Sequence, residues 1–330
     1  MELEHSTILV TGGAGFIGSN IVKSLVEEGA DVIVYDNFST GSRNKLKPVL
    51  DKIEIVEADI LDWDRLTTAC QGVDAISHQA AQLEITSAIE EPESDLETNT
   101  TGSLNVFKAA HEHSVEKVVY ASSACVYGQA DEVPQSEDHR TEPNWPYGVS
   151  KLAVDKYAEI FGQYYDIPLI GLRYGITYGP QEWYGRVMTV FLKRALSGEP
   201  PVVWGGDQIR DFIHVDDAVA LHNECLRKGL PTTQFNVGTG VATTIRKLAE
   251  AVVEVTGMDQ DVLYEDIDEG ESSNHVERDR LPMELQRMQL DPSKAKRLLD
   301  WEPTVGLNEG LERQWDWLQD HEERWTEASY

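Results

Sequence analysis

The sequence of 330 residues predicts an α/β fold, in which a doubly wound parallel sheet is joined to a second, smaller lobe. Three observations lead to this prediction. Short apolar runs alternate with amphipathic segments through the first half of the chain, which is the pattern of parallel strands connected by helices. Glycines spaced three residues apart follow the first apolar run, and polar residues or glycines stand where later apolar runs end. After about residue 172 the alternation loosens.

The first apolar run, residues 7–10, predicts a short buried strand, and Gly12, Gly15 and Gly18 follow it directly. Glycines allow a tight turn and let the backbone approach a pyrophosphate closely. The segment after Gly15 is amphipathic, so a helix would begin there and direct its free amides and positive dipole end at the same phosphates. A glycine pattern alone is common, but strand, glycines and helix in this order are typical of a Rossmann dinucleotide site.

A second strand is predicted over residues 31–36, and it ends in Asp36. A carboxylate in this place accepts hydrogen bonds from the ribose hydroxyls of adenosine and repels a 2′-phosphate. We therefore expect NAD rather than NADP as the cofactor. Arg43 is close in the sequence and is a feature that favours NADP.

Four further strands complete the predicted sheet, at residues 53–60, 73–81, 117–124 and 167–175, with a helix over residues 100–113. In doubly wound sheets, ligands bind outside the carboxyl ends of the strands. The positions that fall at such ends are residues 12–18, Asp36, Asp59, residues 78–81, Ser123 and residues 173–175. Their convergence predicts one shared site.

Ser123, Tyr147 and Lys151 together could remove a proton from an alcohol. Tyr147 and Lys151 are four residues apart, so on a helix they would lie on one face. The pKa of a free tyrosine is about 10, and a nearby lysine ammonium would lower it and favour the phenolate. The Ser123 hydroxyl would hold a substrate hydroxyl against that phenolate while a hydride leaves the same carbon. Such spacing also occurs by chance on surface helices, so its weight comes from the neighbouring dinucleotide motif.

After about residue 172 we expect a second lobe that covers the cofactor site. Residues 176–187 are predicted as a loop, 188–198 as a helix, 210–226 as a strand followed by a helix, and 234–240 as another strand. The remainder from Thr243 is expected to be mostly helical, with an acidic loop at residues 261–271 and a final helix after Gly306. The predicted domains are a NAD-binding Rossmann domain at 1–172, with a return segment near 210–240, and a mainly substrate-binding lobe at 173–330.

The charge balance excludes some classes of partner. Acidic residues number 58 and basic residues 28, giving a formal net charge of −30. Such a surface repels nucleic acids and anionic membranes. It serves either solubility or adaptation to high salt. No apolar run approaches the ~20 residues of a membrane span, and we expect no signal peptide because the acidic start leads at once into a strand.

The cysteines and histidines predict no metal site. Cys70, Cys125 and Cys225 have no metal-binding or redox spacing, and scattered thiols of this kind fit a reducing cytoplasm. His111 and His113 are two residues apart in a predicted helix, so they would point to different faces.

The chain resembles the extended short-chain dehydrogenase/reductase family, which includes NAD-dependent sugar-nucleotide epimerases and dehydratases. The resemblance covers nearly the whole length and rests on motifs in a fixed order. They are TGGAGFIG at 11–18, DNFSTG at 36–41, ADI at 58–60, HQAAQ at 78–82, NTTGSLNVFKAA at 99–110, ASSACVYG at 121–128, PYGVSK at 146–151, LRYGITYGP at 172–180, RDFIHVDD at 210–217 and LDWEPTVGLNEGL at 299–311.

The resemblance implies roles for individual residues. Tyr147 would be the base, Lys151 would bind the nicotinamide ribose and lower the pKa of Tyr147, and Ser123 would anchor the sugar hydroxyl. The implied cofactor-binding residues are Gly12, Gly15, Phe16, Ile17, Gly18, Asp36, Asn37, Ser39, Asp59, Ile60, Gln79, Ala80, Ala81, Asn99, Ser122, Tyr147, Lys151, Tyr174 and Gly175. The implied substrate-binding residues are Glu84, Ser123, Tyr147, Ile176, Arg186 and Arg210, of which Arg210 matches the arginine that pairs with the substrate diphosphate. The family also implies a homodimer that pairs through a four-helix interface.

The pair after Ser123 indicates which chemistry of the family to expect. The 4,6-dehydratases carry Asp-Glu in this place, an acid and a base for removing water, whereas this chain has Ala124 and Cys125. The pair resembles that of 4-epimerases. As the family implies the reaction, Tyr147 takes the C4 hydroxyl proton while NAD takes the C4 hydride, and the 4-keto sugar rotates and receives the hydride on its other face. We expect a nucleotide sugar as substrate, in the first place a UDP-hexose.

Two alternatives stay open. Another NAD-dependent modification of a nucleotide sugar (reduction, decarboxylation, dehydration or epimerisation at another carbon) would use the same residues. A non-catalytic NAD-sensing protein would share the fold, although it has no need of the Ser-Tyr-Lys set. Glu84, Trp145 and Ile176 depart from the family pattern. Each indicates a repacked loop, a solvent-facing side chain or an unusual sugar, and a Glu84 that faced the sugar would disfavour a uronic acid.

Overall fold

A parallel sheet forms the centre of the computed structural model, which describes residues 1–182, 186–276, 280 and 283–321. Within these residues the sheet has seven parallel strands, in the order β11 (Thr233–Val237), β6 (Leu169–Tyr174), β5 (Lys117–Ser123), β4 (Ala75–His78), β1 (Thr7–Thr11), β2 (Asp31–Asp36) and β3 (Ile53–Glu57). The strand order reverses between β1 and β4, so the crevice at their carboxyl ends is the position where such sheets bind ligands. The predicted fold class is confirmed.

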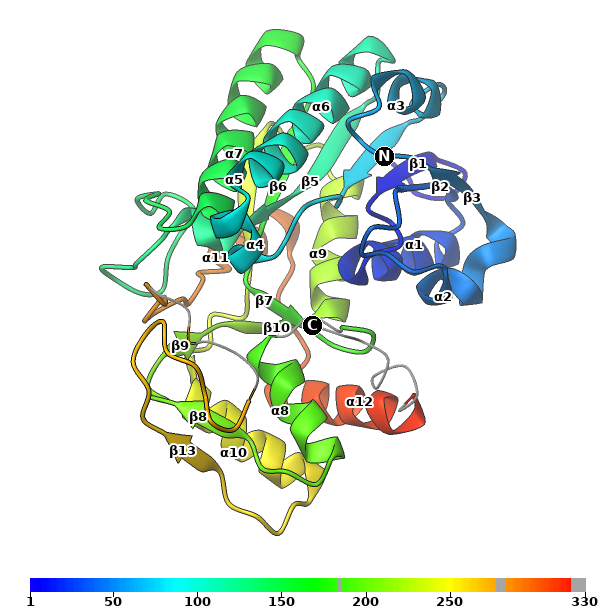
Figure 1. Cartoon of the computed structure of the whole chain (residues 1–330). Helices are drawn as coiled ribbons and strands as arrows, with labels where there is room; N and C mark the ends of the chain where they lie inside the picture. The colour runs from blue at the N-terminus through cyan, green and yellow to red at the C-terminus, as the bar shows by residue number, and fades with distance from the viewer. Residues whose placement is uncertain (183–185, 277–279, 281–282, 322–330) are drawn as a thin grey trace.

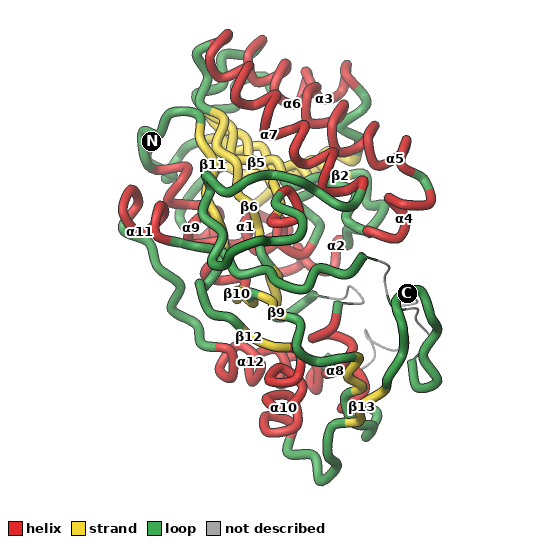
Figure 2. Tube along the Cα trace, turned by 90° about the vertical axis from the view of Figure 1, so that its left-hand side faces the viewer, coloured by secondary structure: helices red, strands yellow, loops and turns green. Residues whose placement is uncertain are grey.

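Helices cover both faces of the sheet, as Figures 1 and 2 show. One face packs against α1 (Phe16–Glu27), α9 (Val215–Arg227) and α11 (Ser293–Leu299), with α2 (Arg43–Leu46) and η1 (Lys47–Lys52) at its edge. The other packs against α3 (Trp63–Ala69), α6 (Gly102–Glu112) and α7 (Pro146–Tyr165). The short elements α4 (Ile85–Glu90), α5 (Pro92–Leu96) and η2 (Glu97–Thr101) lie against α7.

Alternate side chains of each strand point to opposite faces of the sheet and contribute to the apolar core on each face. In β1, Ile8 and Val10 are buried on the side of α1 and α9, whereas Leu9 is buried on the side of α3, α6 and α7. Successive strand residues point to opposite faces, so a strand covered on both sides has to be apolar throughout. This explains why the first strands read as continuous apolar runs.

The second lobe has its own small core, below the sheet in Figure 1. Its helices are α8 (Val187–Leu196), α10 (Ile245–Thr256) and α12 (Leu307–Asp320). Its short strands pair as β7 (Ile176–Tyr178) with β10 (Phe212–His214), β8 (Val202–Trp204) with β13 (Leu263–Glu265), and β9 (Ile209–Arg210) with β12 (Thr243–Thr244). A one-turn 3-10 helix, η3 (Ala124–Val126), follows β5.

Some predicted elements differ from the structure. The strands β3 and β4 are shorter than predicted, so Asp59 lies two residues after its strand. The predicted loop at 176–187 contains β7, because its backbone pairs with that of β10. The segment from Thr243 is less helical than predicted, since most described residues between α10 and α11 are irregular. The domain boundaries stay a prediction, although β11 and α9 pack in the first lobe.

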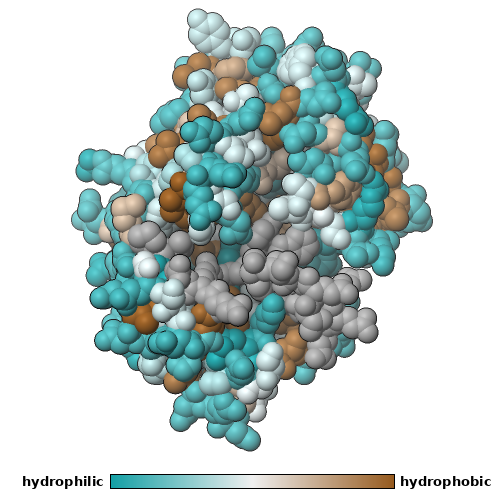
Figure 3. Space-filling model, viewed as in Figure 1, coloured by the Kyte–Doolittle hydropathy of each residue, from teal (hydrophilic) through white to brown (hydrophobic). Residues whose placement is uncertain are grey.

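Hydrophilic side chains cover most of the face seen in Figure 3. None of the described helices combines the length and apolar character needed to cross a membrane. The three cysteines are free thiols.

The net charge of −30 leaves many carboxylates without a basic partner. Repulsion between these like charges opposes the folded state.

We predict that added salt stabilises this protein. Raising KCl from about 0.1 M to about 2 M should raise the thermal midpoint, because salt screens repulsion between like charges. The measurement is calorimetry across the salt series, with a series in a neutral osmolyte as the control. A midpoint that stayed constant or fell with KCl would contradict this expectation.

Candidate functional site

The turn between β1 and α1 requires glycine. Gly12 has φ +66°, and a Cβ at this position would lie 2.5 Å from the Ala80 nitrogen at the end of β4. A Cβ at Gly18 would overlap the carbonyl oxygen of Gly12. Gly15 caps α1 without a side-chain hydrogen bond, so the amides of residues 16–18 have no capping partner from it. The backbone forms a cradle for an anion beside Ala80, and NAD fits it because its pyrophosphate would meet amides and a helix dipole.

Asp36 closes the adenosine side of the cradle. Its carboxylate accepts hydrogen bonds from the amides of Ala14 (2.8 Å) and Phe38 (2.7 Å). Burial raises the pKa of Asp36, and these two amides act in the opposite direction. Each carboxylate oxygen keeps a second lone pair for a ribose hydroxyl, so the residue suits NAD.

The neighbouring predicted residues form a second polar group. The Asn37 side chain donates to the Asp59 carboxylate (2.8 Å) and accepts from the Ser39 amide (3.0 Å). Ser39 itself is exposed, whereas Ile60 is buried against Gly102. These side chains lie just after the ends of β2 and β3. Asn37, Ser39 and Asp59 form the polar rim of the adenosine side, and Ile60 forms its apolar floor.

The ends of β4 and β6 meet on the other side of β1. The Tyr174 hydroxyl donates to the Gln79 side chain (3.3 Å), and the Ala80 amide donates to the Thr11 hydroxyl (3.4 Å). Ala81 is half-buried, and the Gly175 amide donates to the Val237 carbonyl (2.9 Å). Ser122 differs from its neighbours, because its buried hydroxyl makes no hydrogen bond to any of the residues that the structure describes.

Ser123, Tyr147 and Lys151 lie together at the junction of β5 and α7. All three are buried. The Lys151 ammonium donates to the Ala121 carbonyl (3.0 Å), and its nitrogen lies 5.9 Å from the centre of the Tyr147 ring. The Ser123 oxygen accepts from the Cys125 amide (3.1 Å) and so caps η3. The sequence of α7 therefore brings the base candidate and its lysine to one helix face, against the serine.

Burial dominates the electrostatics of this group. Burial raises the pKa of Tyr147, and the nearby Cys125 raises it further, whereas Arg186 and Ser123 act to lower it. Burial also lowers the pKa of Lys151 to about 8. In the protein chain by itself, loss of hydration therefore dominates the pKa of Tyr147, and a lowering of this pKa by Lys151 stays a prediction.

Two arginines of the second lobe lie near Cys125, the second residue after Ser123. Arg186, at the start of α8, and Arg210, in β9, both lie close enough to Cys125 to favour its thiolate. Arg210 pairs with Glu284 (3.3 Å), and the same carboxylate pairs with Arg280 (3.2 Å). The sequence analysis missed Glu284, which carries no recognisable local pattern.

The three departures from the family pattern have ordinary surroundings. Ile176 packs against two apolar clusters, and its amide donates to the Asp211 carbonyl (3.0 Å). Trp145 is buried at the first turn of α7. Glu84 is exposed at the start of α4. The packing of Ile176 and Trp145 favours the interpretation as repacked loops.

Asn99, a predicted cofactor-binding residue, belongs to a polar network whose members Asp95 and Ser150 were not predicted. Its amide nitrogen donates to Asp95 (2.8 Å), to the Gln82 carbonyl (3.0 Å) and to Ser150 (3.3 Å). Asp95 and Ser150 were missed, although Asp95 precedes Asn99 by one helical turn and Ser150 precedes Lys151 directly. The segment at residues 93–101 is polar almost throughout, so no sequence signal singled out Asp95.

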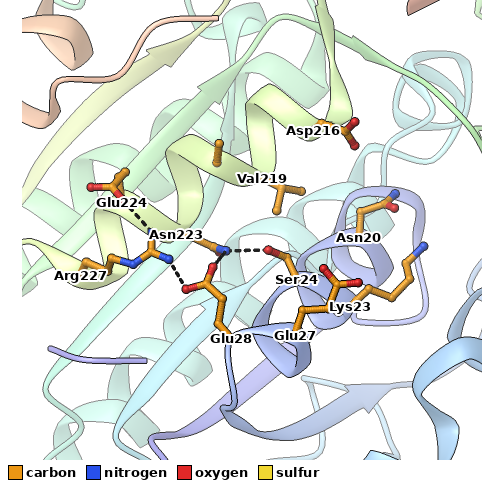
Figure 4. A pocket seen from close by; sticks show the side chains of 11 residues that line it. Asn20, Lys23, Ser24, Glu27, Glu28, Asp216, Val219, Asn223, Glu224 and Arg227 are labelled. Atoms are coloured by element: carbon orange, nitrogen blue, oxygen red, sulfur yellow. Dashed lines mark hydrogen bonds and ion pairs between the residues drawn. The ribbon is translucent and has the colours of Figure 1, made fainter. Parts of the chain in front are cut away.

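A hollow between α1 and α9 lies outside this site (Figure 4). Its volume is about 480 Å³, and its lining mixes carboxylates with Lys23 and Arg227. Within it, the Asn223 amide donates to Ser24 and to Glu28, both at 2.9 Å. These hydrogen bonds join α9 to the end of α1, so the residues of the hollow contribute to the packing of the two helices.

His111 and His113, at the carboxyl end of α6, contact protein side chains. His111 stacks on Tyr165 with ring centres 4.1 Å apart, and the His113 ring pairs with the Thr67 hydroxyl (2.8 Å). Among the described residues, no three His, Cys, Asp or Glu side chains converge as metal ligands.

Comparison with known proteins agrees with this geometry. The chain is 33% identical over 314 residues to UDP-glucose 4-epimerase of Mycolicibacterium smegmatis, covering 92% of this chain and 95% of the relative. The crystal structure of UDP-glucose 4-epimerase from Thermotoga maritima with UDP-glucose is 34% identical, with a TM-score of 0.86, and covers 95% of this chain and 99% of that one. The enzyme of the same name from Thermus thermophilus, in complex with NAD, is 33% identical with a TM-score of 0.84 and covers 96% and 99%.

The sequence model of the NAD dependent epimerase/dehydratase family matches residues 8–238, which include the glycine turn, Asp36 and the Ser-Tyr-Lys group. With this match over most of the chain, and with relatives of similar length above 30% identity, the protein belongs to the NAD dependent epimerase/dehydratase family.

Proposed function

We propose that the protein inverts C4 of a UDP-hexose, the reaction named for its relatives. The observation that carries the proposal is the assembly of Ser123, Tyr147 and Lys151 at the same carboxyl edge of the sheet as the glycine turn. A proton acceptor and a hydride acceptor are then adjacent to one carbon. A sensor of NAD has no use for this arrangement.

Each residue has one task in the proposed reaction. Tyr147 takes the proton of the C4 hydroxyl and later returns it to the oxygen of the intermediate ketone. Ser123 hydrogen-bonds that hydroxyl and keeps it in reach of the phenol. Lys151 holds its ammonium next to Tyr147, where it favours the phenolate once the proton has to leave. When bound, NAD supplies reversible hydride acceptance, so the hydride that leaves C4 can return on the other face.

The residues after Ser123 argue against removal of water. Ala124 has no titratable group, and burial raises the pKa of the Cys125 thiol. Neither side chain can act as the carboxylic acid and base that dehydration needs. Epimerisation requires one proton acceptor, which Tyr147 provides, and this favours it over the dehydratase alternative within the same family.

The second lobe supplies charges for the rest of the substrate. Arg186 and Arg210 are cationic and come close to the catalytic group from the side that Cys125 faces. The overall charge of −30 repels a nucleotide diphosphate, so a local pair of guanidinium groups is required to hold one. Glu284 neutralises Arg210 and would have to share it with the diphosphate.

The experiment that tests the proposal uses the purified protein and a panel of nucleotide sugars. UDP-glucose should be converted to UDP-galactose without added cofactor, because NAD is regenerated in each turnover. The panel includes UDP-N-acetylhexosamines, a UDP-uronic acid and dTDP-glucose. A change confined to another carbon, or loss of water from dTDP-glucose, would replace the proposal by one of its alternatives.

We also propose that the protein pairs with itself through α7 and works in the cytoplasm. Apolar side chains line the outer face of α7 at helical spacing, namely Val149, Tyr157, Ile160 and Tyr164, of which Tyr164 is 83% exposed. An exposed apolar helix face of this length is typical of a protein interface. The free, scattered thiols fit a reducing compartment.

A charge on this stripe should separate the pair. Ile160→Glu should convert a dimer to a monomer, because a carboxylate would be buried without a partner. The measurement is sedimentation equilibrium, with Val241→Glu on the second lobe as the control for an added exposed charge. A wild-type protein that sediments as a monomer would end this part of the proposal.

Removing the Tyr147 hydroxyl should abolish turnover and leave the fold intact. Tyr147→Phe keeps the buried ring and should lose about 100- to 10,000-fold in turnover, the usual effect of a missing general base. Tyr164→Phe is the control, since this exposed ring lies on the same helix. Retention of more than about a tenth of wild-type turnover, well above that range, would assign the base to another residue.

Arg210 should affect substrate binding rather than cofactor binding. Arg210→Ala should weaken substrate binding by about 2 kcal/mol, or roughly thirty-fold, as for a charge-assisted hydrogen bond. Glu284→Gln should act in the opposite direction by releasing Arg210. Calorimetry with the nucleotide sugar measures both effects, and Arg246→Ala, which removes an exposed arginine, is the control. An Arg210→Ala protein with unchanged substrate affinity would show that the diphosphate binds elsewhere.

A further inference from the structure

A chain of side-chain hydrogen bonds crosses the sheet from the cofactor side to α9. It begins at Gln79, whose side-chain nitrogen donates to the hydroxyl of Ser77 in β4 (3.2 Å). The Ser77 hydroxyl lies 2.8 Å from Nε2 of His222 in α9, and Nδ1 of the same ring lies 3.0 Å from Oδ1 of Asn223. Ser77 and His222 are fully buried. The proposed reaction gives these two residues no task.

The far end of the chain fixes the direction of its hydrogen bonds. The Glu28 carboxylate pairs with Arg227, so it is charged and can only accept (Figure 4). The Asn223 side chain therefore turns its nitrogen toward Glu28 (2.9 Å) and its oxygen toward His222. An amide oxygen cannot donate, so the hydrogen between Asn223 and His222 is on Nδ1 of the ring.

The charge of His222 decides how the Gln79 amide lies. The ring is neutral, because it has no exposed surface and both of its hydrogen-bond partners are uncharged. Burial also lowers the pKa of His222 to about 4. Nε2 then carries no hydrogen and accepts from Ser77, whose single hydrogen is thereby used, so Ser77 has to accept from the Gln79 nitrogen. A charged ring would donate to Ser77 and favour the opposite orientation of the Gln79 amide.

The Gln79 amide lies on the side of the sheet edge where the nicotinamide would bind. Its oxygen accepts from the hydroxyl of Tyr174 at the end of β6 (3.3 Å). The glycine turn after β1 fits the pyrophosphate and Asp36 the adenosine, so the nicotinamide end would lie toward β4, β5 and β6. The second hydrogen on the Gln79 nitrogen has no partner among the residues that the structure describes. The carboxamide oxygen of nicotinamide is an acceptor that suits it.

We propose that His222 is a positioning residue for the cofactor. Acting through Ser77, it holds the Gln79 amide in the orientation that offers a hydrogen to the nicotinamide end of NAD. The inference rests on the proposed function, which puts that end beside Tyr147 and Lys151. His222 touches neither cofactor nor substrate, so its effect passes through Gln79.

Competition between NAD and ADP-ribose tests this role without turnover. ADP-ribose has the adenosine and the diphosphate of NAD but no nicotinamide, so the ratio of the two bound nucleotides isolates the nicotinamide end. The purified protein is equilibrated with mixtures of both, and the bound nucleotides are separated and quantified. His222→Leu should lower the preference for NAD by about three- to tenfold, as for the loss of one neutral hydrogen bond. Gln79→Ala should lower it to a similar extent.

Two further variants distinguish this role from a general effect on folding. In the double variant Gln79→Ala/His222→Leu the preference should fall no further than in Gln79→Ala, because no amide is left to position. Cys225→Ala is the control, since it changes another buried side chain of α9 and should leave the preference unchanged. An unchanged preference in His222→Leu, or effects that add in full, would overturn the inference. If His222→Leu does not fold, Ser77→Ala interrupts the same chain and is judged by the same outcomes.

Nitrogen-15 NMR of the histidine rings checks the chain in the unaltered protein. The His222 signals, assigned from their absence in His222→Gln, should show a hydrogen on Nδ1 and none on Nε2 at about pH 7. A hydrogen on Nε2 would reverse the orientation deduced for Gln79 and contradict the proposal. Failure of the nucleotide-sugar panel would contradict the proposed function, whereas these two measurements need no sugar and judge the role of His222 separately.

Discussion

Burial of the Lys151 ammonium is the constraint around which the centre of the molecule is built. A cation in the protein interior loses its hydration and has to be compensated by carbonyl oxygens and carboxylates. Ala121 of β5 supplies a carbonyl, and the negative charges of Asp95 and Asp155 act to raise the pKa of Lys151, which burial lowers. Asp155 in turn pairs with Arg173, so α7 is bound to β5 through Lys151 and to β6 through Asp155.

The same network continues to the edge of the sheet. Arg173 donates to the Tyr127 hydroxyl (3.0 Å), and this hydroxyl donates to Asn236 of β11 (2.6 Å). Breaking one member of a buried ion pair typically costs about 3–5 kcal/mol. Burial of Lys151 in this place therefore depends on the residues packed behind it. In the second lobe, two buried carboxylates also hold chain segments in place. Asp211 accepts hydrogen bonds from the backbone amides of residues 239–240, and Asp217 accepts them from residues 304–305.

The sequence was sufficient for the sheet and for the residues at its carboxyl ends, because both depend on local patterns. The alternation of apolar runs follows from strands covered on two sides, and Gly12 and Gly18 follow from a turn in which a Cβ has no space. Residues whose role depends on distant partners could not be predicted in this way. Asp95 resembles its exposed acidic neighbours in the sequence, and only the packing of α5 on α7 turns it inward. The effect of burial on the pKa of Tyr147 could not be predicted for the same reason, since spacing shows a lysine nearby and says nothing of burial.

The central claim is that one hydride leaves C4 and returns to it from the same site. The most direct measurement is turnover of UDP-glucose that carries deuterium at C4, followed by NMR or mass analysis of the product. The account predicts UDP-galactose with the deuterium retained at C4, in ordinary water and with no cofactor added. Loss of the deuterium to the solvent would contradict this account. Exchange of a hydrogen at a carbon next to C4 with solvent during turnover would also contradict it.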